Sequence, residues 1–409
     1  MNIIYLAAYF YPEKYSSNNI YNAILEELVK TNTVHVITPQ PTRGVSTTEY
    51  CNYNSDEMIN GVIIHRFPMV RESSKTIQRF LRYKKCASYY MKIATQLGKI
   101  DCIFAASTPP TMGFVAGKLA KKLGVPFIYS LQDIFPDSLV TTGLITEQRG
   151  VMWRIGRFIE NRIYKKCSHI IAISDDFKKN LVKKGVPERR ITVIRNFVDL
   201  EFCKPVARKD NRLFDEFGLD RNKFYVTYAG NFGKAQNLEV LLQVACILQG
   251  EADIEFILIG DGTEAKSLKE LAKNFKLSNL HFYPMQPNNR IAEVYSFGDA
   301  SVVICRKGSG TSAMPSKTWS IMACAAPVIA SFDENTDMER IIIDSKCGVF
   351  VKSDDPQALA DAINILSKNK RLIVEMGKCG KKYIAENISQ TVGVSKYISV
   401  ITSSVTADM

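Results

Sequence analysis

Histidine is scarce in this chain of 409 residues, which contains four, and the ten cysteines form no C-x-x-C pair. Zinc centres need histidine and cysteine clustered at short spacings, so neither a metal site nor a metal cofactor is expected here. Because the cysteines are scattered along the chain, we expect free, mostly buried thiols in a reducing cytoplasm.

Long apolar runs are also missing, since no stretch approaches the roughly 20 apolar residues that a membrane-spanning helix needs. The opening residues MNIIYLAAYFYP contain no basic segment and no small-residue cleavage motif, so they predict a first strand and not a secretory signal. Low-complexity segments are absent too. An apolar content of 46% and a charged content of 23% are typical of a globular protein.

Acidic residues are outnumbered, because 53 lysines and arginines face 41 aspartates and glutamates and leave a net charge of +12. Such a charge predicts an anionic partner, either a phosphorylated ligand, an acidic membrane or a nucleic acid. No nucleic-acid-binding motif appears, so a nucleic-acid partner is not expected.

Short β-rich apolar runs alternate with helical patterns along the whole chain, which predicts α/β folding with parallel sheets. The length favours two domains, and we expect two Rossmann-like, doubly wound domains that face a cleft. The predicted boundaries are residues 1–200 for an acceptor-binding domain, 201–223 for a linker about which the domains close, 224–385 for a nucleotide-sugar-binding domain, and 386–409 for a tail that packs back toward the first domain.

The stretch GSGTSAMPSKTWSIMACAAPVIAS, residues 308–331, predicts an anion site where a loop enters a helix. Gly308 and Gly310 let the backbone approach a ligand, and Pro315 suits a first helical turn. Helix N-termini attract anions. The cationic and hydroxyl side chains that would complete a diphosphate cradle are Arg306, Lys307, Ser316 and Lys317. The alternative is a solvated loop whose charges serve solubility.

Two further loops also join a strand to a helix. YAGNFGKAQNLEVLL contains Gly230, Gly233 and Lys234, and ILIGDGTEAKSLKELA contains Gly260, Asp261 and Gly262. The second fits G-x-G-x-x-A only weakly, because no acidic residue for a ribose follows the next strand. We interpret all three loops as walls of one nucleotide site, although each alone is compatible with an ordinary turn.

Taken in order, several segments resemble the family 4 glycosyltransferases of the GT-B fold. The segments are SHIIAISDDFKKNLVKKGVPERRITVIRNFVD, YAGNFGKAQNLEVLL, FILIGDGTEAKSL and PSKTWSIMACAAPVIAS. AASTPPTMGF and YSLQDIFPDSL resemble the branch that builds O-antigen and capsule repeats and includes L-fucosaminyl transferases. The resemblance implies retaining transfer of a sugar, expected to be an N-acetylated aminodeoxyhexose, from a UDP-sugar to a polyprenyl-diphosphate-linked saccharide, without a metal.

The chain departs from the family pattern at the nucleotide site. Ser312 and Ser320 stand where the resemblance implies two glutamates, and Asn231 and Gln236 stand where it implies an arginine and a lysine. More of the diphosphate charge would then fall on Lys234, Arg306 or Lys317. The predicted donor-binding residues are Gly230, Asn231, Lys234, Gly260, Asp261, Gly262, Met285, Arg306, Lys307, Ser312, Pro315, Ser316, Lys317 and Ser320.

On the acceptor side, Asp133 in LQDIFPDS is the candidate catalytic residue, because a carboxylate after an apolar strand can orient or deprotonate an acceptor hydroxyl. The alternative is an aspartate that pins the turn before Pro136, and Asp137 is a second choice. Ser16, Ser17 and Asn18 occupy the place of an acceptor loop, although Asn18 also suits a helix cap. The four histidines lie in or beside strand patterns and are expected to be structural.

Residues 75–95 and 151–166 combine basic and aromatic residues at helical spacing, which suits an anionic membrane surface. The alternative is a pair of core-packed helices with solvated basic faces. We expect a cytoplasmic enzyme that binds the inner leaflet of the cytoplasmic membrane. The competing functions are a UDP-sugar 2-epimerase on the same scaffold and a non-catalytic glycosyltransferase-like binding subunit.

Overall fold

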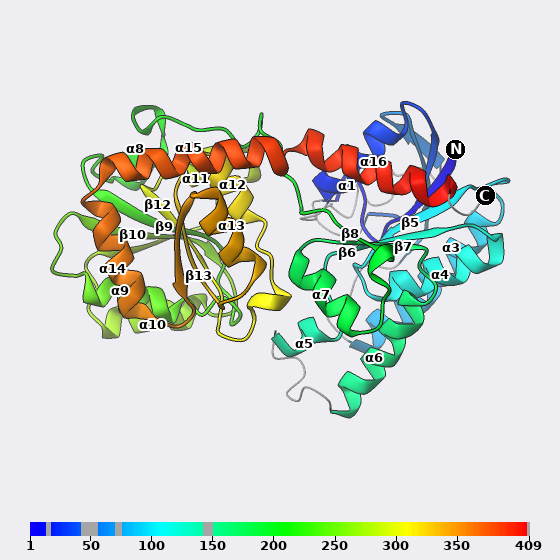
Figure 1. The fold of residues 1–409 in the computed structure, drawn as a ribbon, viewed down its shortest axis with the longest axis horizontal. Coiled ribbons are helices and arrows are strands. Elements are labelled where there is room, and N and C mark those ends of the chain that lie inside the picture. Colours follow the sequence, from blue (N-terminus) through cyan, green and yellow to red (C-terminus); the bar gives the residue numbers. More distant parts are fainter. Residues whose placement is uncertain (14–17, 42–55, 70–75, 142–149, 407–409) are drawn as a thin grey trace. The chain divides into compact units, whose positions relative to one another are not determined.

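A computed structural model of the chain describes residues 1–13, 18–41, 56–69, 76–141 and 150–406. These residues form two compact units (Figure 1). Among the described residues, unit 1 contains those within 1–140, 150–195 and 393–406, and unit 2 contains Thr141 and residues 196–392. Each unit has one largely parallel sheet with helices packed on it, so the predicted pair of Rossmann-like α/β domains is confirmed.

Unit 1 is built on an eight-stranded sheet with the order β3-β4-β2-β1-β5-β6-β7-β8. The strands are β1 (Asn2–Leu6), β2 (Thr33–Pro39), β3 (Asp56–Ile59), β4 (Val62–Phe67), β5 (Cys102–Ala106), β6 (Phe127–Leu131), β7 (His169–Ala172) and β8 (Ile191–Val193). Strands β5 and β6 are buried along their whole length, as expected of central strands that helices cover on both faces.

Strand β3 is the one antiparallel strand of this sheet in the described ranges, and the sequence analysis did not predict it. It pairs with β4 through a tight turn in which Asn60 and Gly61 have φ angles of 51° and 80°. Both central residues of such a turn need positive φ, a requirement that Asn-Gly meets better than most dipeptides. The short strand β8 was also missed.

The helices of unit 1 cover both faces of the sheet (Figure 1). Tyr21 of α1 donates to the Ser130 hydroxyl, which also lies 3.0 Å from the Tyr397 hydroxyl of α16, so these two helices share one face. The helices are α1 (Asn18–Leu28), α3 (Thr76–Ala94), α4 (Thr111–Leu123), α5 (Asp137–Thr141), α6 (Val151–Tyr164), α7 (Asp175–Lys183) and α16 (Gln390–Thr406). None of the described helices is long and apolar enough to cross a bilayer.

Unit 2 is built on a six-stranded parallel sheet with the order β11-β10-β9-β12-β13-β14. The strands are β9 (Phe224–Asn231), β10 (Ile254–Asp261), β11 (Leu280–Tyr283), β12 (Ala300–Ile304), β13 (Val328–Phe332) and β14 (Gly348–Lys352). The helices are α8 (Leu213–Phe217), α9 (Glu239–Ile247), α10 (Ala265–Asn274), α11 (Ile291–Tyr295), α12 (Lys317–Ala323), α13 (Asp337–Ser345), α14 (Pro356–Ser367) and α15 (Lys370–Asn387).

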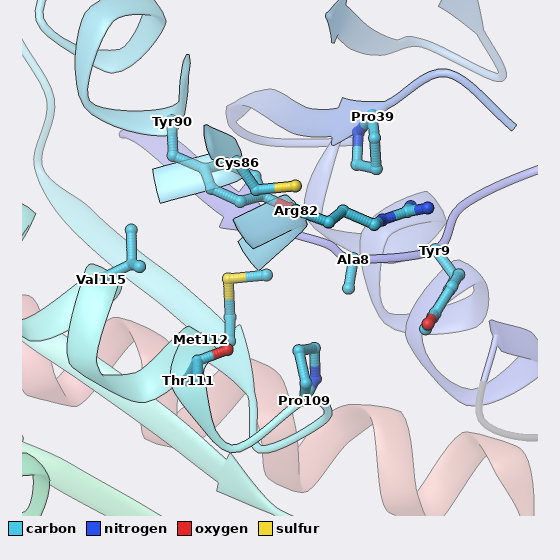
Figure 2. A pocket seen from close by; sticks show the side chains of 10 residues that line it. All are labelled: Ala8, Tyr9, Pro39, Arg82, Cys86, Tyr90, Pro109, Thr111, Met112 and Val115. Atoms are coloured by element: carbon cyan, nitrogen blue, oxygen red, sulfur yellow. The ribbon is translucent and has the colours of Figure 1, made fainter. Parts of the chain in front are cut away.

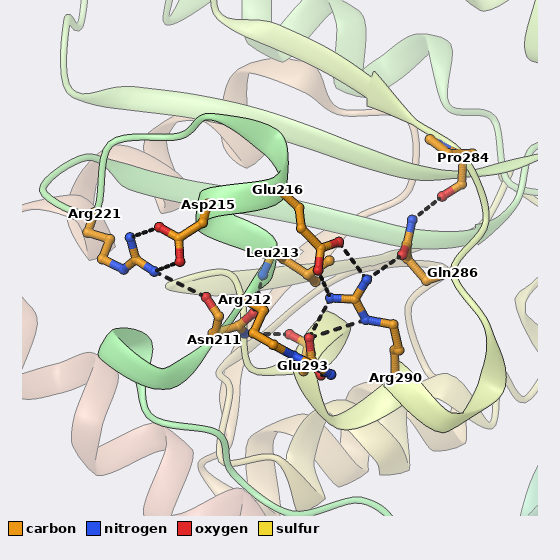
Figure 3. Close-up of polar contacts among 10 residues, drawn as sticks. All are labelled: Asn211, Arg212, Leu213, Asp215, Glu216, Arg221, Pro284, Gln286, Arg290 and Glu293. Carbon is orange, nitrogen blue, oxygen red and sulfur yellow. Dashed lines mark hydrogen bonds and ion pairs between the residues drawn. The ribbon is translucent and has the colours of Figure 1, made fainter.

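Most of the predicted linker is an integral part of unit 2. Leu213 and Phe214 are fully buried in a cluster with Tyr225 and Phe297. Figure 3 shows the polar contacts that also hold this segment to unit 2. Arg290 bonds there to the carboxylates of both Glu216 and Glu293. The structure assigns the predicted linker, residues 201–223, to unit 2, and its polar composition conceals two core residues and several ion-pair partners.

The end of the chain also differs from the predicted boundary at residue 386. Ser389 pairs with Val198 within unit 2, and the structure assigns only residues 393–406 to unit 1. Tyr397 is fully buried there, and its ring lies 6.1 Å from that of Phe104.

Candidate functional site

Three glycines shape the carboxyl ends of strands β9 and β10. Gly230 lies opposite Gly260 in the register, and a Cβ on Gly260 would meet the Gly230 carbonyl oxygen at 1.9 Å. A Cβ on Gly262 would meet the Phe232 carbonyl oxygen at 2.4 Å. These glycines therefore permit close approach of two backbone segments. The two loops that were predicted to line the nucleotide site therefore lie side by side. The glycines are also needed for the close packing of the two backbones itself.

Lys317, the first residue of α12, reaches back to the end of β9. Its Nζ donates to the Ala229 carbonyl at 3.2 Å and lies 3.7 Å from the centroid of the Tyr228 ring. A Cβ on Gly230, whose φ is 143°, would lie 3.1 Å from the same Nζ. Burial lowers the pKa of Lys317 to about 7, because desolvation disfavours the ammonium form.

The loop between β12 and α12 is organised by Asp333, which the sequence analysis did not single out. Its carboxylate accepts the backbone N–H groups of Gly308 at 2.8 Å and Gly310 at 2.9 Å, and the Ser353 hydroxyl at 2.7 Å. The N–H groups of Gly308 and Gly310 are therefore already bonded within unit 2, and the approach of a ligand to this backbone stays a prediction. Their N–H groups hold the loop to the residue that follows β13.

Asp354 ties two more of these loops together. Its carboxylate accepts the Asn237 amide at 2.6 Å and the Lys307 backbone N–H at 3.3 Å. The Arg306 N–H bonds to the Ala235 carbonyl at 2.9 Å. The loops that follow β9, β12 and β14 thus form one connected edge, as expected where the carboxyl ends of parallel strands meet.

The cations predicted for the diphosphate are available along this edge. Lys234, Arg306 and Lys307 are exposed. In the part of the chain that the structure describes, none of these three side chains forms an ion pair or a side-chain hydrogen bond. They differ in this from the many paired basic residues of unit 2, and an anion would meet no competing carboxylate on them.

The helix start contributes less than predicted. Helix α12 has seven residues and begins at Lys317, with Ser316 as an N-cap that makes no side-chain hydrogen bond. Pro315 lies before the helix, where its carbonyl accepts the Thr318 N–H at 3.1 Å. Because so short a helix has a weak dipole, the charge of Lys317 is the more important feature.

The remaining predicted donor residues have mixed surroundings. The side chains of Ser320 and Cys203 lie within hydrogen-bonding reach of each other, and the Ser312 N–H bonds to the Ser309 carbonyl at 3.1 Å. Asn231 and Asp261 end their paired strands with exposed side chains, and Met285 is 54% exposed beyond β11. The structure brings the residues of β9, β10, β12 and α12 to one edge.

In unit 1, Asp133 follows β6 at the carboxyl edge of the sheet, and its N–H bonds to the Ser107 hydroxyl at 3.3 Å. The Asp133 side chain is exposed, and partial desolvation by the surrounding protein raises the pKa of its carboxyl above the ordinary value. Asp137, the second choice, is buried and bonds to Lys184 at 2.8 Å and Asn180 at 3.1 Å. Asp137, at the start of α5, therefore holds α5 against α7 and the residue that follows it.

A small pocket at the same edge of unit 1 was not predicted (Figure 2). Ala8, Tyr9, Pro39, Pro109 and Thr111 line it at the ends of β1, β2 and β5. Helix α3 contributes Arg82, Cys86 and Tyr90, all buried. One face of α3 is thus core, whereas Lys84 and Lys85 are exposed, as in the alternative of a core-packed helix with a solvated basic face.

Ser16 and Ser17 lie outside the described residues, and Asn18 is the first residue of α1. The four histidines all lie in strands. His35 and His65 contact each other at 3.0 Å, His169 contacts Thr192 at 2.8 Å, and His281 contacts Glu255 at 2.8 Å. All four therefore have structural partners. Over the described ranges, no group of three potential ligands could hold a metal ion.

Two family profiles match successive parts of the chain. "Glycosyltransferase Family 4" matches residues 21–202, and "Glycosyl transferases group 1" matches residues 209–383. The probable glycosyltransferase WbjE of Pseudomonas aeruginosa is 23% identical over 76% of this chain and 77% of its own length. The putative colanic acid biosynthesis glycosyl transferase WcaI of Escherichia coli K12 is 25% identical over 68% of this chain and 69% of its own length.

Solved structures share the fold. HepE of Anabaena in complex with UDP superimposes with a TM-score of 0.74 at 14% identity, over 98% of this chain and 100% of that one. Sucrose-phosphate synthase of Thermosynechococcus elongatus does so with a TM-score of 0.76 at 16% identity, over 99% of each chain. Because the two profiles together span most of the chain and the double α/β fold agrees with them, the chain belongs to the family 4 (group 1) glycosyltransferases of the GT-B fold.

Proposed function

We propose that this glycosyltransferase moves a sugar from a UDP-sugar to a hydroxyl of a polyprenyl-diphosphate-linked saccharide, with retention, in surface polysaccharide synthesis. The observation that carries the donor half is Lys317, held against Gly230 and Ala229 at the carboxyl edge of the unit 2 sheet. UDP in the HepE complex supports the nucleotide, the name of WbjE supports glycosyl transfer, and the colanic acid biosynthesis in the name of WcaI supports the polysaccharide context.

In this proposal the cations of unit 2 stabilise the leaving diphosphate. As the bond from the sugar to the diphosphate breaks, negative charge grows on the phosphate oxygens. Lys317 would receive that charge from a position held by its bond to the Ala229 carbonyl, and the exposed side chains of Lys234 and Arg306 would close on the diphosphate from the loops beside it. Ser312 and Ser320 retain hydroxyl donors in place of the carboxylates that family members usually carry, so no acidic group at these two positions opposes the diphosphate.

Asp133 is proposed to act on the acceptor. Its position after β6 and its raised pKa suit a carboxyl that orients the acceptor hydroxyl or receives its proton. The sugar is expected to be an N-acetylated aminodeoxyhexose, as the resemblance to the fucosaminyl branch implies, and the enzyme is expected to work at the inner face of the cytoplasmic membrane.

The test is a thermal-shift panel of UDP, GDP, ADP, TDP and CMP on the purified chain, because a ligand that binds the folded state raises the apparent melting temperature. UDP is expected to stabilise the wild type, and Lys317→Ala is expected to abolish that shift. Asp133→Asn is expected to keep the UDP shift while it lowers transfer about 10²–10⁴-fold.

Other outcomes of the panel identify other functions. A shift with GDP alone would redirect the donor assignment. UDP binding without transfer to any lipid-extract acceptor would favour the non-catalytic binding subunit. Turnover of a UDP-sugar in the absence of an acceptor would favour the epimerase.

A further inference from the structure

Helix α6 presents an apolar stripe to the outside of unit 1. Val151, Met152, Ile155, Phe158 and Ile159 are 74%, 67%, 52%, 58% and 38% exposed. Their spacing places them on one face of an α-helix. An amphipathic surface helix usually turns this face toward the core, so α6 has the reverse arrangement. We call these five residues the α6 stripe.

Polar contacts fix the helix in this orientation. Glu160 is 3% exposed, and its carboxylate bonds to Lys184 at 3.1 and 3.2 Å and also to Arg157 and Tyr164. A Cβ on Gly156 would lie 2.7 Å from the Pro136 side chain, so the inner face of α6 packs closely. Rotating the helix to bury the stripe would expose this ion cluster and break that packing.

The neighbouring helix α4 extends the apolar surface. A Cβ on Gly113 of α4 would lie 2.7 Å from the Ile163 side chain of α6, which shows how closely the two helices pack. Phe114 is 42% exposed, and the Lys166 Nζ lies 5.0 Å from its ring centroid.

The exposed charges that α4 and α6 themselves carry are of one sign. Glu160 is the sole acidic residue of α4 and α6, and it is buried. The exposed charged residues on and directly after these helices are Lys118, Lys121, Lys122, Arg154, Arg162 and Lys165. The Arg162 guanidinium lies 4.4 Å over the Phe158 ring, so a cation borders the stripe itself.

We propose that the α6 stripe, with Phe114, is a docking surface for an anionic phospholipid bilayer, with α6 lying in the plane of the interface. Apolar side chains would enter the acyl boundary while the surrounding cations meet anionic headgroups, as in other interfacial helices. A second copy of this chain is a poorer occupant, since a two-fold contact would bring the same cations together. The inference rests on the proposed function only in that a lipid-linked acceptor requires the enzyme at a membrane.

The experiment measures co-sedimentation of the full chain with vesicles of phosphatidylcholine alone and of phosphatidylcholine mixed with phosphatidylglycerol. Wild type is expected to bind the mixed vesicles, more weakly at high salt. The double change Ile155→Glu and Phe158→Glu is expected to weaken binding at least about tenfold, because it places two carboxylates in the stripe. Lys122→Glu is expected to weaken it about fivefold or more.

Ile365→Glu is the matched control, because Ile365 is 63% exposed on α14 of unit 2. It should bind vesicles like the wild type. All variants should keep the UDP thermal shift, which separates this test from that of the donor site. Absence of wild-type binding to the mixed vesicles, binding that the double change leaves intact, or a wild-type dimer that the double change dissociates would each overturn the proposal.

Discussion

At the scale of single residues, Lys317 combines its proposed role in donor binding with a cost to stability. Its ammonium is desolvated beside the Tyr228 ring, and its pKa falls to about 7. The free chain therefore holds it partly neutral near physiological pH. A bound diphosphate would favour the charged form, so donor binding and proton uptake at Lys317 should be linked.

The affinity for UDP-glucose should consequently fall as the pH rises through about 7, because the neutral lysine gives up its charge. UDP-glucose is the proper ligand for this measurement, since its diphosphate, unlike that of UDP, does not titrate near neutrality. Calorimetry between about pH 6 and about pH 9 should show the decline in wild type and a flat profile in Lys317→Met. An identical decline in both proteins would show that another group is responsible.

The effect of pH on stability through Lys317 should run opposite to its effect on donor affinity, so that the fold gains stability as the pH rises. The folded pKa of Lys317 lies below its unfolded value, so the penalty for burying the charge is complete below about pH 7 and fades as the pH rises toward the unfolded value. Any gain in melting temperature from Lys317→Met should therefore be larger at about pH 6 than at about pH 9.

Asp133 and Lys317 could be identified from their places after a strand and at a loop end, but Asp333 and Asp354 could not. Their importance lies in backbone N–H groups that belong to loops more than 20 residues away in the sequence, namely those of Gly308 and Lys307. No local pattern marks which carboxylate will accept such groups. The one available signal is that each aspartate directly or closely follows a strand.

At the scale of elements, the Asp333 carboxylate is what holds the loop between β12 and α12. Asp333→Ala should lower the free energy of unfolding by about 1–3 kcal/mol, because it leaves backbone donors without an acceptor. It should also weaken UDP binding, since Arg306 and Lys307 lie at the start of the released loop. Chemical denaturation and the UDP thermal shift measure the two effects.

Glu334→Ala is the control for that change. Its carboxylate pairs with Lys352 at 3.0 Å, but both side chains are at least half exposed, and such surface pairs contribute about 0–1 kcal/mol. If Glu334→Ala weakens UDP binding as much as Asp333→Ala does, the loop is not held in the way described.

Strands were predicted from the sequence where they are buried and rich in β-forming residues, as at β5 and β13. The strands β3 and β8 were missed, because their signal is a turn or only a few residues. The Asn60-Gly61 dipeptide was a readable hairpin signal, because both residues tolerate positive φ. The exposed face of α6 is different. Its residue pattern predicts an amphipathic helix, but only the ion cluster around Glu160 decides which face turns inward, and that cluster depends on Lys184 of another element.

At the scale of the whole molecule, the two units should unfold with separable responses to ligand and to mutation. Tyr397 is fully buried in unit 1 and bonds to Ser130. Tyr397→Ala should cost about 3–5 kcal/mol through the cavity that it leaves, and Tyr397→Phe about 1 kcal/mol through the lost hydrogen bond. Differential scanning calorimetry should show a lowered transition that UDP does not restore.

Thr402→Ala, on the exposed side of the same helix, is expected to leave that transition in place. UDP should still raise the transition of unit 2 in all three variants. A single transition that shifts as one with both UDP and Tyr397→Ala would mean that the units unfold together.

The position of α16 has a consequence for the order of events during protein synthesis. Almost all of unit 2 is the single stretch 196–392, and all of unit 2 has been made before Tyr397 leaves the ribosome. Synthesis of unit 1 begins before that of unit 2, but Phe104 and Ser130 lack a neighbour until Tyr397 of α16 has been made. The unit whose synthesis begins first is therefore the unit whose core is completed last. A premature stop just before Tyr397 would leave unit 2 whole and unit 1 with an open core.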